Sequence, residues 1–79
     1  MRYLIKYFAV FRFKTNKDEE WVDSSAQNPM ELFRELEQRY SFQGDLSTLR
    51  VAVNAQYSSF DAVLKDGDTV VFIPPISGG

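Results

Sequence analysis

The chain has 79 residues, a net charge of −2, and neither cysteine nor histidine. This length predicts a single domain, 1–79. The missing cysteines exclude disulfides, iron–sulfur clusters and cysteine nucleophiles. Histidine, the commonest general base and metal ligand, is also missing. The acidic balance argues against nucleic-acid binding, and no apolar run approaches the roughly 18 residues of a membrane span. No signal-peptide pattern opens the sequence, so we expect a cytoplasmic protein that uses no membrane.

Period-two alternation predicts a first strand over residues 2–13. One face carries Tyr3, Ile5, Tyr7, Ala9, Phe11 and Phe13. The other face carries Leu4, Phe8 and Val10, which predicts a strand covered on both sides at its middle. The end of this segment, 11–14, is also compatible with a helical turn. Residues 15–18 predict a turn, and 19–23 predict a second strand that completes a hairpin.

Basic residues are concentrated in the N-terminal quarter of the chain. They are Arg2, Lys6, Arg12, Lys14 and Lys17. Because the chain as a whole is acidic, we interpret them as solvated strand and turn positions rather than a phosphate-binding surface.

A helix is predicted over residues 29–40. Asn28 is suited to the N-cap, Pro29 to the first helical position, and Glu31 to a capping-box-like pattern. The apolar positions expected to face the core are Met30, Leu32, Phe33, Leu36 and Tyr40.

The C-terminal half alternates loops and strands. Residues 41–47 predict a loop, and 49–54 a strand with Leu49, Val51 and Val53 inward. Residues 54–61 predict a turn followed by an irregular segment with Tyr57 and Phe60. Asp66-Gly67-Asp68 predicts a turn, because aspartate caps locally and glycine supplies positive φ. The last strand is expected over 69–73.

The order hairpin, helix, strand, short segment, strand implies a crossover connection and at least one parallel strand pair. Pairing the first strand with the last, the two most apolar, packs the helix across one face of a mixed sheet. The predicted fold is therefore α+β, with β-grasp (ubiquitin-like) architecture. This fold projects the C-terminus from the end of a central strand.

Side-chain constellations for catalysis are missing from the sequence. Asp61, Asp66 and Asp68 are close in sequence, but turn positions explain them better than a metal site. Ser58-Ser59 lacks a histidine partner for nucleophilic attack. We expect no enzyme in its own right, and no metal or cofactor bound by this chain.

The C-terminal stretch, 73–79, combines a stiff stalk with a thin end. Pro74 and Pro75 fix φ and favour extended backbone. Gly78 and Gly79 have no Cβ and can enter a slot too narrow for other residues. Our hypothesis is that the carboxylate of Gly79 is the reactive group and that another protein's active site receives the tail, about 75–79. The alternative is an inert, frayed end.

Three segments, Val51–Asn54, Leu64–Asp68 and Val70–Gly79, closely resemble the small subunit of molybdopterin synthase, the MoaD family. Asp-Gly-Asp, Phe-x-Pro-Pro and the final Gly-Gly carry the resemblance. A relative in thiamine synthesis shares the fold and the Gly-Gly but usually lacks Pro-Pro. Family members often have a short helical turn ending in glycine near 11–20, and the glycine is missing here.

The resemblance implies that Gly79 is adenylated by a partner related to ubiquitin-activating enzymes, which uses ATP. Sulfur from a sulfur-donating enzyme would then convert Gly79 to a thiocarboxylate. Two small subunits would flank a dimer of large, catalytic subunits, and sulfur would pass to cyclic pyranopterin monophosphate. The residues implied in tail insertion are Pro75, Ile76, Ser77 and Gly78.

Phe72, Ile73 and Pro74, at the base of the tail, are candidates for docking the partner. For Phe72, burial in the core is at least as good an interpretation. Two alternatives to the molybdenum pathway stay open: a carrier for thiamine or a tungsten cofactor, and a protein modifier that forms isopeptides. A plain interaction domain is a third.

Overall fold

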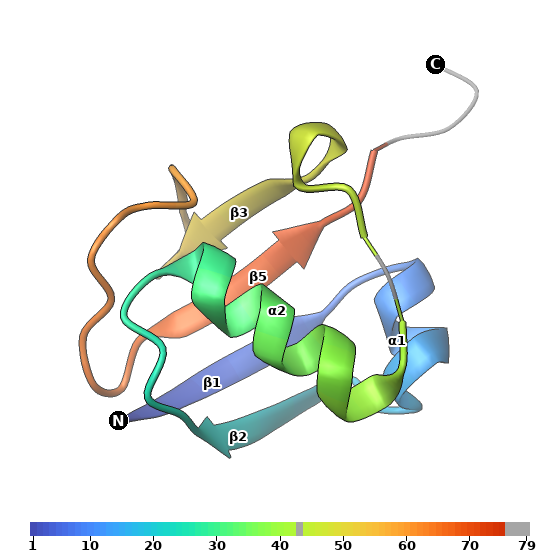
Figure 1. Ribbon diagram of the computed structural model, residues 1–79, viewed down its shortest axis with the longest axis horizontal. Coiled ribbons are helices and arrows are strands. Elements are labelled where there is room, and N and C mark those ends of the chain that lie inside the picture. Colours follow the sequence, from blue (N-terminus) through green and yellow to red (C-terminus); the bar gives the residue numbers. More distant parts are fainter. Residues whose placement is uncertain (43, 76–79) are drawn as a thin grey trace.

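The computed structural model describes residues 1–42 and 44–75 (Figure 1). In chain order, the elements are β1 (Arg2–Tyr7), α1 (Val10–Thr15), β2 (Glu19–Asp23), α2 (Pro29–Tyr40), the 3₁₀ helix η1 (Leu46–Thr48), β3 (Arg50–Val53), β4 (Gln56–Ser58) and β5 (Thr69–Ile73). In these ranges, no helix is both long and apolar enough to cross a membrane.

The five strands form one sheet in the order β2-β1-β5-β3-β4, so β5 is central. β1 and β5 are parallel, with Ile5 opposite Val70 and Tyr7 opposite Phe72. The other three pairs are antiparallel. Helix α2 crosses one face of this sheet (Figure 1). The predicted α+β, β-grasp fold with a mixed sheet is confirmed.

The prediction of a strand over 2–13 is wrong beyond Tyr7. Ala9 turns the chain with φ 52° and ψ −122°, and α1 follows. Phe11 and Thr15, one helical turn apart, are buried, whereas Phe8 and Val10 are exposed. The alternative of a helical turn is therefore the correct one, and the expected cover on both faces of the first strand is missing.

α1 ends at Asn16, which has φ 60° and donates its backbone N–H to the carbonyl of Arg12. Asparagine tolerates this left-handed conformation better than most residues, so it replaces the glycine that the resemblance led us to expect.

Helix α2 has the predicted bounds and the predicted cap. The Asn28 side chain accepts a bond of 2.8 Å from the backbone N–H of Glu31, and the Glu31 side chain accepts one of 2.8 Å from that of Gln27. Leu32, Phe33 and Leu36 are fully buried on the sheet. Met30 is exposed, so its placement on the core face was wrong.

The segment expected to be irregular after residue 54 contains β4. Asn54 and Ala55 both have positive φ, 52° and 70°, which gives the two-residue turn of a tight hairpin. Val51, Ala52 and Val53 pair with Ser58, Tyr57 and Gln56. Strand β3 itself is shorter than expected, 50–53, and η1 lies at the end of the predicted 41–47 loop. The Asp66–Asp68 turn is confirmed, with Gly67 at φ 89°.

The core between α2 and the sheet is built around aromatic rings. Phe33 lies at its centre, with ring centroids 5.8 Å from Phe11, 5.6 Å from Phe42 and 5.0 Å from Phe72. Edge-to-face and tilted contacts at these distances stabilise the fold beyond the effect of buried apolar area alone. α1, α2 and β5 therefore share one packing unit.

A polar network closes the core at the end of β1. The Tyr7 hydroxyl donates to Glu20 at 2.5 Å, the Tyr40 hydroxyl donates to the same carboxylate, and Lys17 Nζ lies 3.2 Å from its other oxygen. Burial disfavours the charged form of Glu20, but the bonds from Tyr40, Tyr7 and Lys17 outweigh it and hold its pKa below the ordinary value. Burial and the bond to Glu20 raise the pKa of Tyr7, which keeps it a donor.

The lowered pKa of Glu20 predicts acid sensitivity. The unfolded chain takes up this proton near the ordinary glutamate pKa of 4.5, and the folded chain does so only at lower pH. The free energy of unfolding should fall as pH drops from 4.5 through the folded pKa. Glu20→Gln should cost about 1–3 kcal/mol at neutral pH and flatten this decline. Urea titrations at a series of pH values test this, and parallel acid limbs for the two proteins would contradict it.

Candidate functional site

The base of the C-terminal tail is fixed by the central strand. β5 pairs with β1 on one side and with β3 on the other, where Ile73 lies opposite Arg50. Pro74 then follows half-buried and Pro75 exposed. The remaining predicted site residues, Ile76, Ser77, Gly78 and Gly79, lie outside the described residues.

Phe72 is core and not a docking residue. Its side chain is 2% exposed, and its ring lies against Phe33 and stacks on Phe60 at 6.4 Å. Strand alternation explains this, because Phe72 shares the inward face with Val70 while Val71 and Ile73 point to the other face. Docking at Phe72 is therefore corrected in favour of the core alternative, and Ile73 and Pro74 keep partial exposure.

The face of the sheet opposite α2 is an apolar surface that sequence analysis missed. The register places Tyr57 beside Ala52 and Ala52 beside Val71 in one row. Leu4 lies between Trp21 and Thr69 in the next row. Helices α1 and α2, the two α-helices of the described chain, leave this face open (Figure 1). We call it the outer sheet patch: Leu4, Trp21, Ala52, Tyr57, Val71 and Ile73.

Charged residues border the outer sheet patch on the β1–β2 side. Arg2 lies 3.6 Å from Asp23 and 5.1 Å above the Trp21 ring. Lys6 and Glu19 are cross-strand partners in the register. An apolar centre with a charged border is typical of a protein–protein contact. The sequence signal for the outer sheet patch was the period-two alternation in β3 and β5. That alternation could identify the patch only once it was known which strands are paired.

The acidic residues near the Gly67 turn serve the turn itself. Asp66 accepts a bond of 2.7 Å from the backbone of Arg2. Asp68 accepts bonds of 2.8 Å from the backbone of Lys65 and 2.9 Å from the Asn54 amide. Their interpretation as turn residues agrees with these bonds, and the described ranges contain no group of three acidic side chains placed to hold a metal ion.

The sequence matches the model of the ThiS family over residues 5–79. The chain belongs to the ThiS family. The resemblance drawn from the C-terminal motifs is thereby confirmed, and the chain is a ThiS/MoaD-type sulfur carrier with a ubiquitin-like fold. A search of curated proteins gave no match.

Solved structures of three relatives show the same fold. A putative molybdopterin converting factor subunit 1 from Pyrococcus furiosus is 32% identical, with a TM-score of 0.78, over 96% of this chain and 99% of its own. SAMP1 from Haloferax volcanii is 19% identical, with a TM-score of 0.80, over the whole of both chains. In a complex of subunits 1 and 2 of molybdopterin-converting factor from Helicobacter pylori, the matching chain is 22% identical, with a TM-score of 0.68 and full coverage of both.

Because Phe72 and Ile73 lie on opposite faces of β5, we predict unequal losses of stability for substitutions at these two neighbours. Phe72→Ala removes a ring from the core and should lower the free energy of unfolding by about 3–5 kcal/mol. Ile73→Ala acts on the half-exposed face and should cost about 1 kcal/mol, mostly in strand propensity. Denaturant titration compares the two, and equal losses would contradict the assignment of faces.

Proposed function

We propose that this chain is the sulfur carrier subunit of a molybdopterin synthase, with the carboxylate of Gly79 as its reactive group. The observation that carries the proposal is the base of the tail: Ile73 ends a strand paired on both sides, and Pro74-Pro75 follows at once. A central strand gives the tail a fixed origin. The 32% identity to a putative molybdopterin converting factor subunit 1 supports the choice of pathway.

The proposed chemistry needs only the terminal carboxylate from this chain. On an adenylyltransferase related to ubiquitin-activating enzymes, the Gly79 carboxylate attacks ATP, pyrophosphate leaves, and an acyl adenylate forms. The terminal sulfur of a persulfide on a donor enzyme attacks the acyl carbon and AMP leaves, which gives an acyl disulfide. A second thiol of the donor system then attacks the donor sulfur, so that the S–S bond breaks, a disulfide forms and the thiocarboxylate is released. Transfer of that sulfur to cyclic pyranopterin monophosphate and hydrolysis of the intermediate thioester return the carboxylate. The large subunit supplies the catalytic groups.

The outer sheet patch is the proposed docking surface for the large subunit. It includes Ile73, the last residue of β5, so a partner seated on it receives the tail directly. Tyr57 is 76% exposed and is a suitable aromatic anchor for such a contact. Two carriers on a dimer of large subunits would give the heterotetramer.

Deletion of Gly79 should leave the fold unchanged and abolish sulfur loading, because the new terminal carboxylate, on Gly78, ends one residue short of the position at which the adenylyltransferase joins the carboxylate to ATP. The measurement is the intact mass after incubation with ATP, the adenylyltransferase and a sulfur donor. The full-length chain should gain the mass difference of one oxygen replaced by one sulfur, and the truncated chain should gain nothing. A truncated chain that still supports molybdopterin synthesis would refute the role of Gly79. Lysine-linked adducts as the main product would assign the chain to the protein modifiers.

Replacement of Gly78 by phenylalanine tests the narrow approach to the carboxylate. A Cβ and a ring should block entry into the slot, so adenylation or sulfur transfer should be lost while the thermal unfolding temperature stays unchanged. Ser77→Ala is the matched control, since it keeps the tail thin. Full activity of Gly78→Phe in the reconstituted synthase would contradict the slot argument.

A further inference from the structure

Helix α1 and the residues just before it present apolar side chains that the described part of the chain leaves exposed. Phe13 is 86% exposed, Phe8 56% and Val10 44%. Helical periodicity forces this arrangement: Phe11 and Thr15 take the core side, and Phe13 projects from the opposite side. Together with the cations Arg12, Lys14 and Lys17, these three residues form what we call the α1 patch.

The α1 patch lies at the end of the sheet where the tail begins. Tyr7 is paired with Phe72 in the parallel register, so β1 and β5 end at the same edge of the sheet, and Phe8 and Pro74 follow them there. Figure 1 shows α1 at the end toward which β1 and β5 run. A protein that takes up the tail therefore approaches this helix as well.

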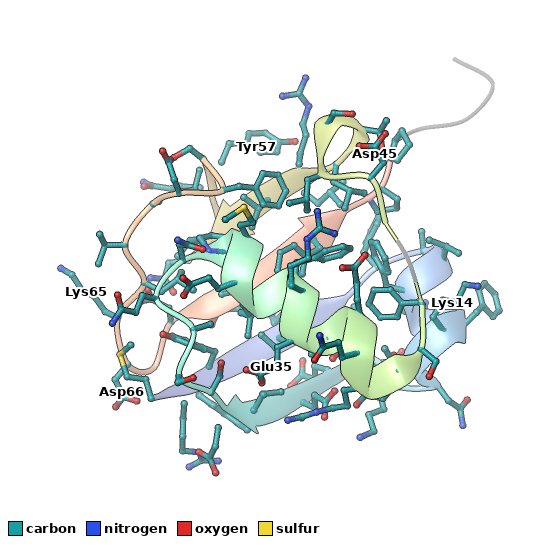
Figure 2. The ribbon with its side chains drawn as sticks, viewed as in Figure 1. Lys14, Glu35, Asp45, Tyr57, Lys65 and Asp66 are labelled. Atoms are coloured by element: carbon teal, nitrogen blue, oxygen red, sulfur yellow. The ribbon has the colours of Figure 1, made fainter. Side chains whose placement is uncertain are left out.

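The α1 patch contains three of the five cations of the N-terminal segment, Arg12, Lys14 and Lys17. Residues 1–17 contain five cations and no acidic residue, whereas residues 18–79 contain four cations and eleven acids. Arg12 is paired with Asp18 at 2.8 Å and Lys17 with Glu20 at 3.2 Å. Among the described residues Lys14 has no ion pair, and it extends from α1 into solvent (Figure 2).

The backbone holds the α1 patch in a strained, defined position. Ala9 has φ 52° and ψ −122°, a conformation that favours glycine, and it is followed directly by the helix. Ala9 and Phe13 line a shallow concavity of about 350 Å3, together with Arg12, Asn16, Lys17 and Asp18. The Phe13 ring can therefore insert into a partner, and the concavity beside it can receive a side chain of that partner.

We propose that the α1 patch binds the adenylyltransferase that activates Gly79, with Phe13 inserted in an apolar pocket bordered by carboxylates. The inference rests on the proposed function and adds a recognition surface separate from the tail and from the outer sheet patch. The charge of Lys14, unpaired within the described ranges, favours an acidic border on the partner. The shared end of the sheet restricts the partner to a protein that receives the tail, and because the outer sheet patch is assigned to the large subunit, the α1 patch is left for the adenylyltransferase.

The test is steady-state pyrophosphate release by the adenylyltransferase of the same organism at saturating ATP, with the full chain as the varied substrate. Phe13→Ser should raise the KM for the chain roughly 10- to 100-fold and leave kcat unchanged. Val63→Ser is the matched control, since Val63 is 81% exposed in the loop before Leu64. Lys14→Glu should raise KM and reverse its dependence on salt, and Lys65→Glu, on a distant loop (Figure 2), should raise KM less.

The outcomes separate the two proposals. A wild-type chain that is activated normally, with equal KM values for Phe13→Ser and Val63→Ser, overturns the role of the α1 patch alone. A wild-type chain that is never activated overturns the proposed function and the partner named here with it. A wild-type dimer that Phe13→Ser dissociates in sedimentation assigns the patch to a second copy and overturns the inference.

Discussion

The parallel pairing of β1 with β5 is the constraint on which the rest of the structure depends. It brings the first and last strands together inside the sheet, and β3 pairs with the other edge of β5. Bonds at the far end extend the pairing: Leu4 donates to Asp68 at 3.0 Å and Asn54 donates to Thr69 at 2.8 Å. Movement of β5 would break two hydrogen-bonded ladders at once. The origin of the tail is therefore as stable as the fold itself.

Alternate residues of β5 have different roles: those on the inner face stabilise the core, and those on the outer face are available for recognition. Val70 and Phe72 are buried against α2, while Thr69, Val71 and Ile73 face the other way. A shift of one residue in register would exchange the two sets, which would expose the Phe72 ring and turn the smaller side chains of Val71 and Ile73 toward α2. The contact of Phe72 with Phe33 at 5.0 Å fixes the register. The composition of the outer sheet patch follows from the packing of the core.

Sequence patterns predicted those parts of the fold in which local and tertiary preferences agree. The cap at Asn28, the turn at Gly67 and the apolar run 69–73 each carry their own local signal. Residues 8–13 alternate like a strand, but burial of Phe11 beside Phe33 and Phe42 selects a helix that no local pattern enforces. β4 was missed because its turn has Ala55 where glycine is usual. The tail motif was found from sequence, whereas the outer sheet patch needed the strand register.

The Glu20 network connects the stability of the fold to the surfaces used for recognition. Its members come from β1, β2, α2 and the turn after α1, so it ties together the end of the sheet that bears the α1 patch. Lys17 shows the connection most directly, because it belongs to the α1 patch and donates to both Glu20 and Tyr40. Protonation of Glu20 removes the charge that holds two phenols and an ammonium together. Loss of this carboxylate would loosen the turn after α1 before the aromatic core, because Phe33 and its neighbours, Phe11 of α1 among them, do not depend on charge.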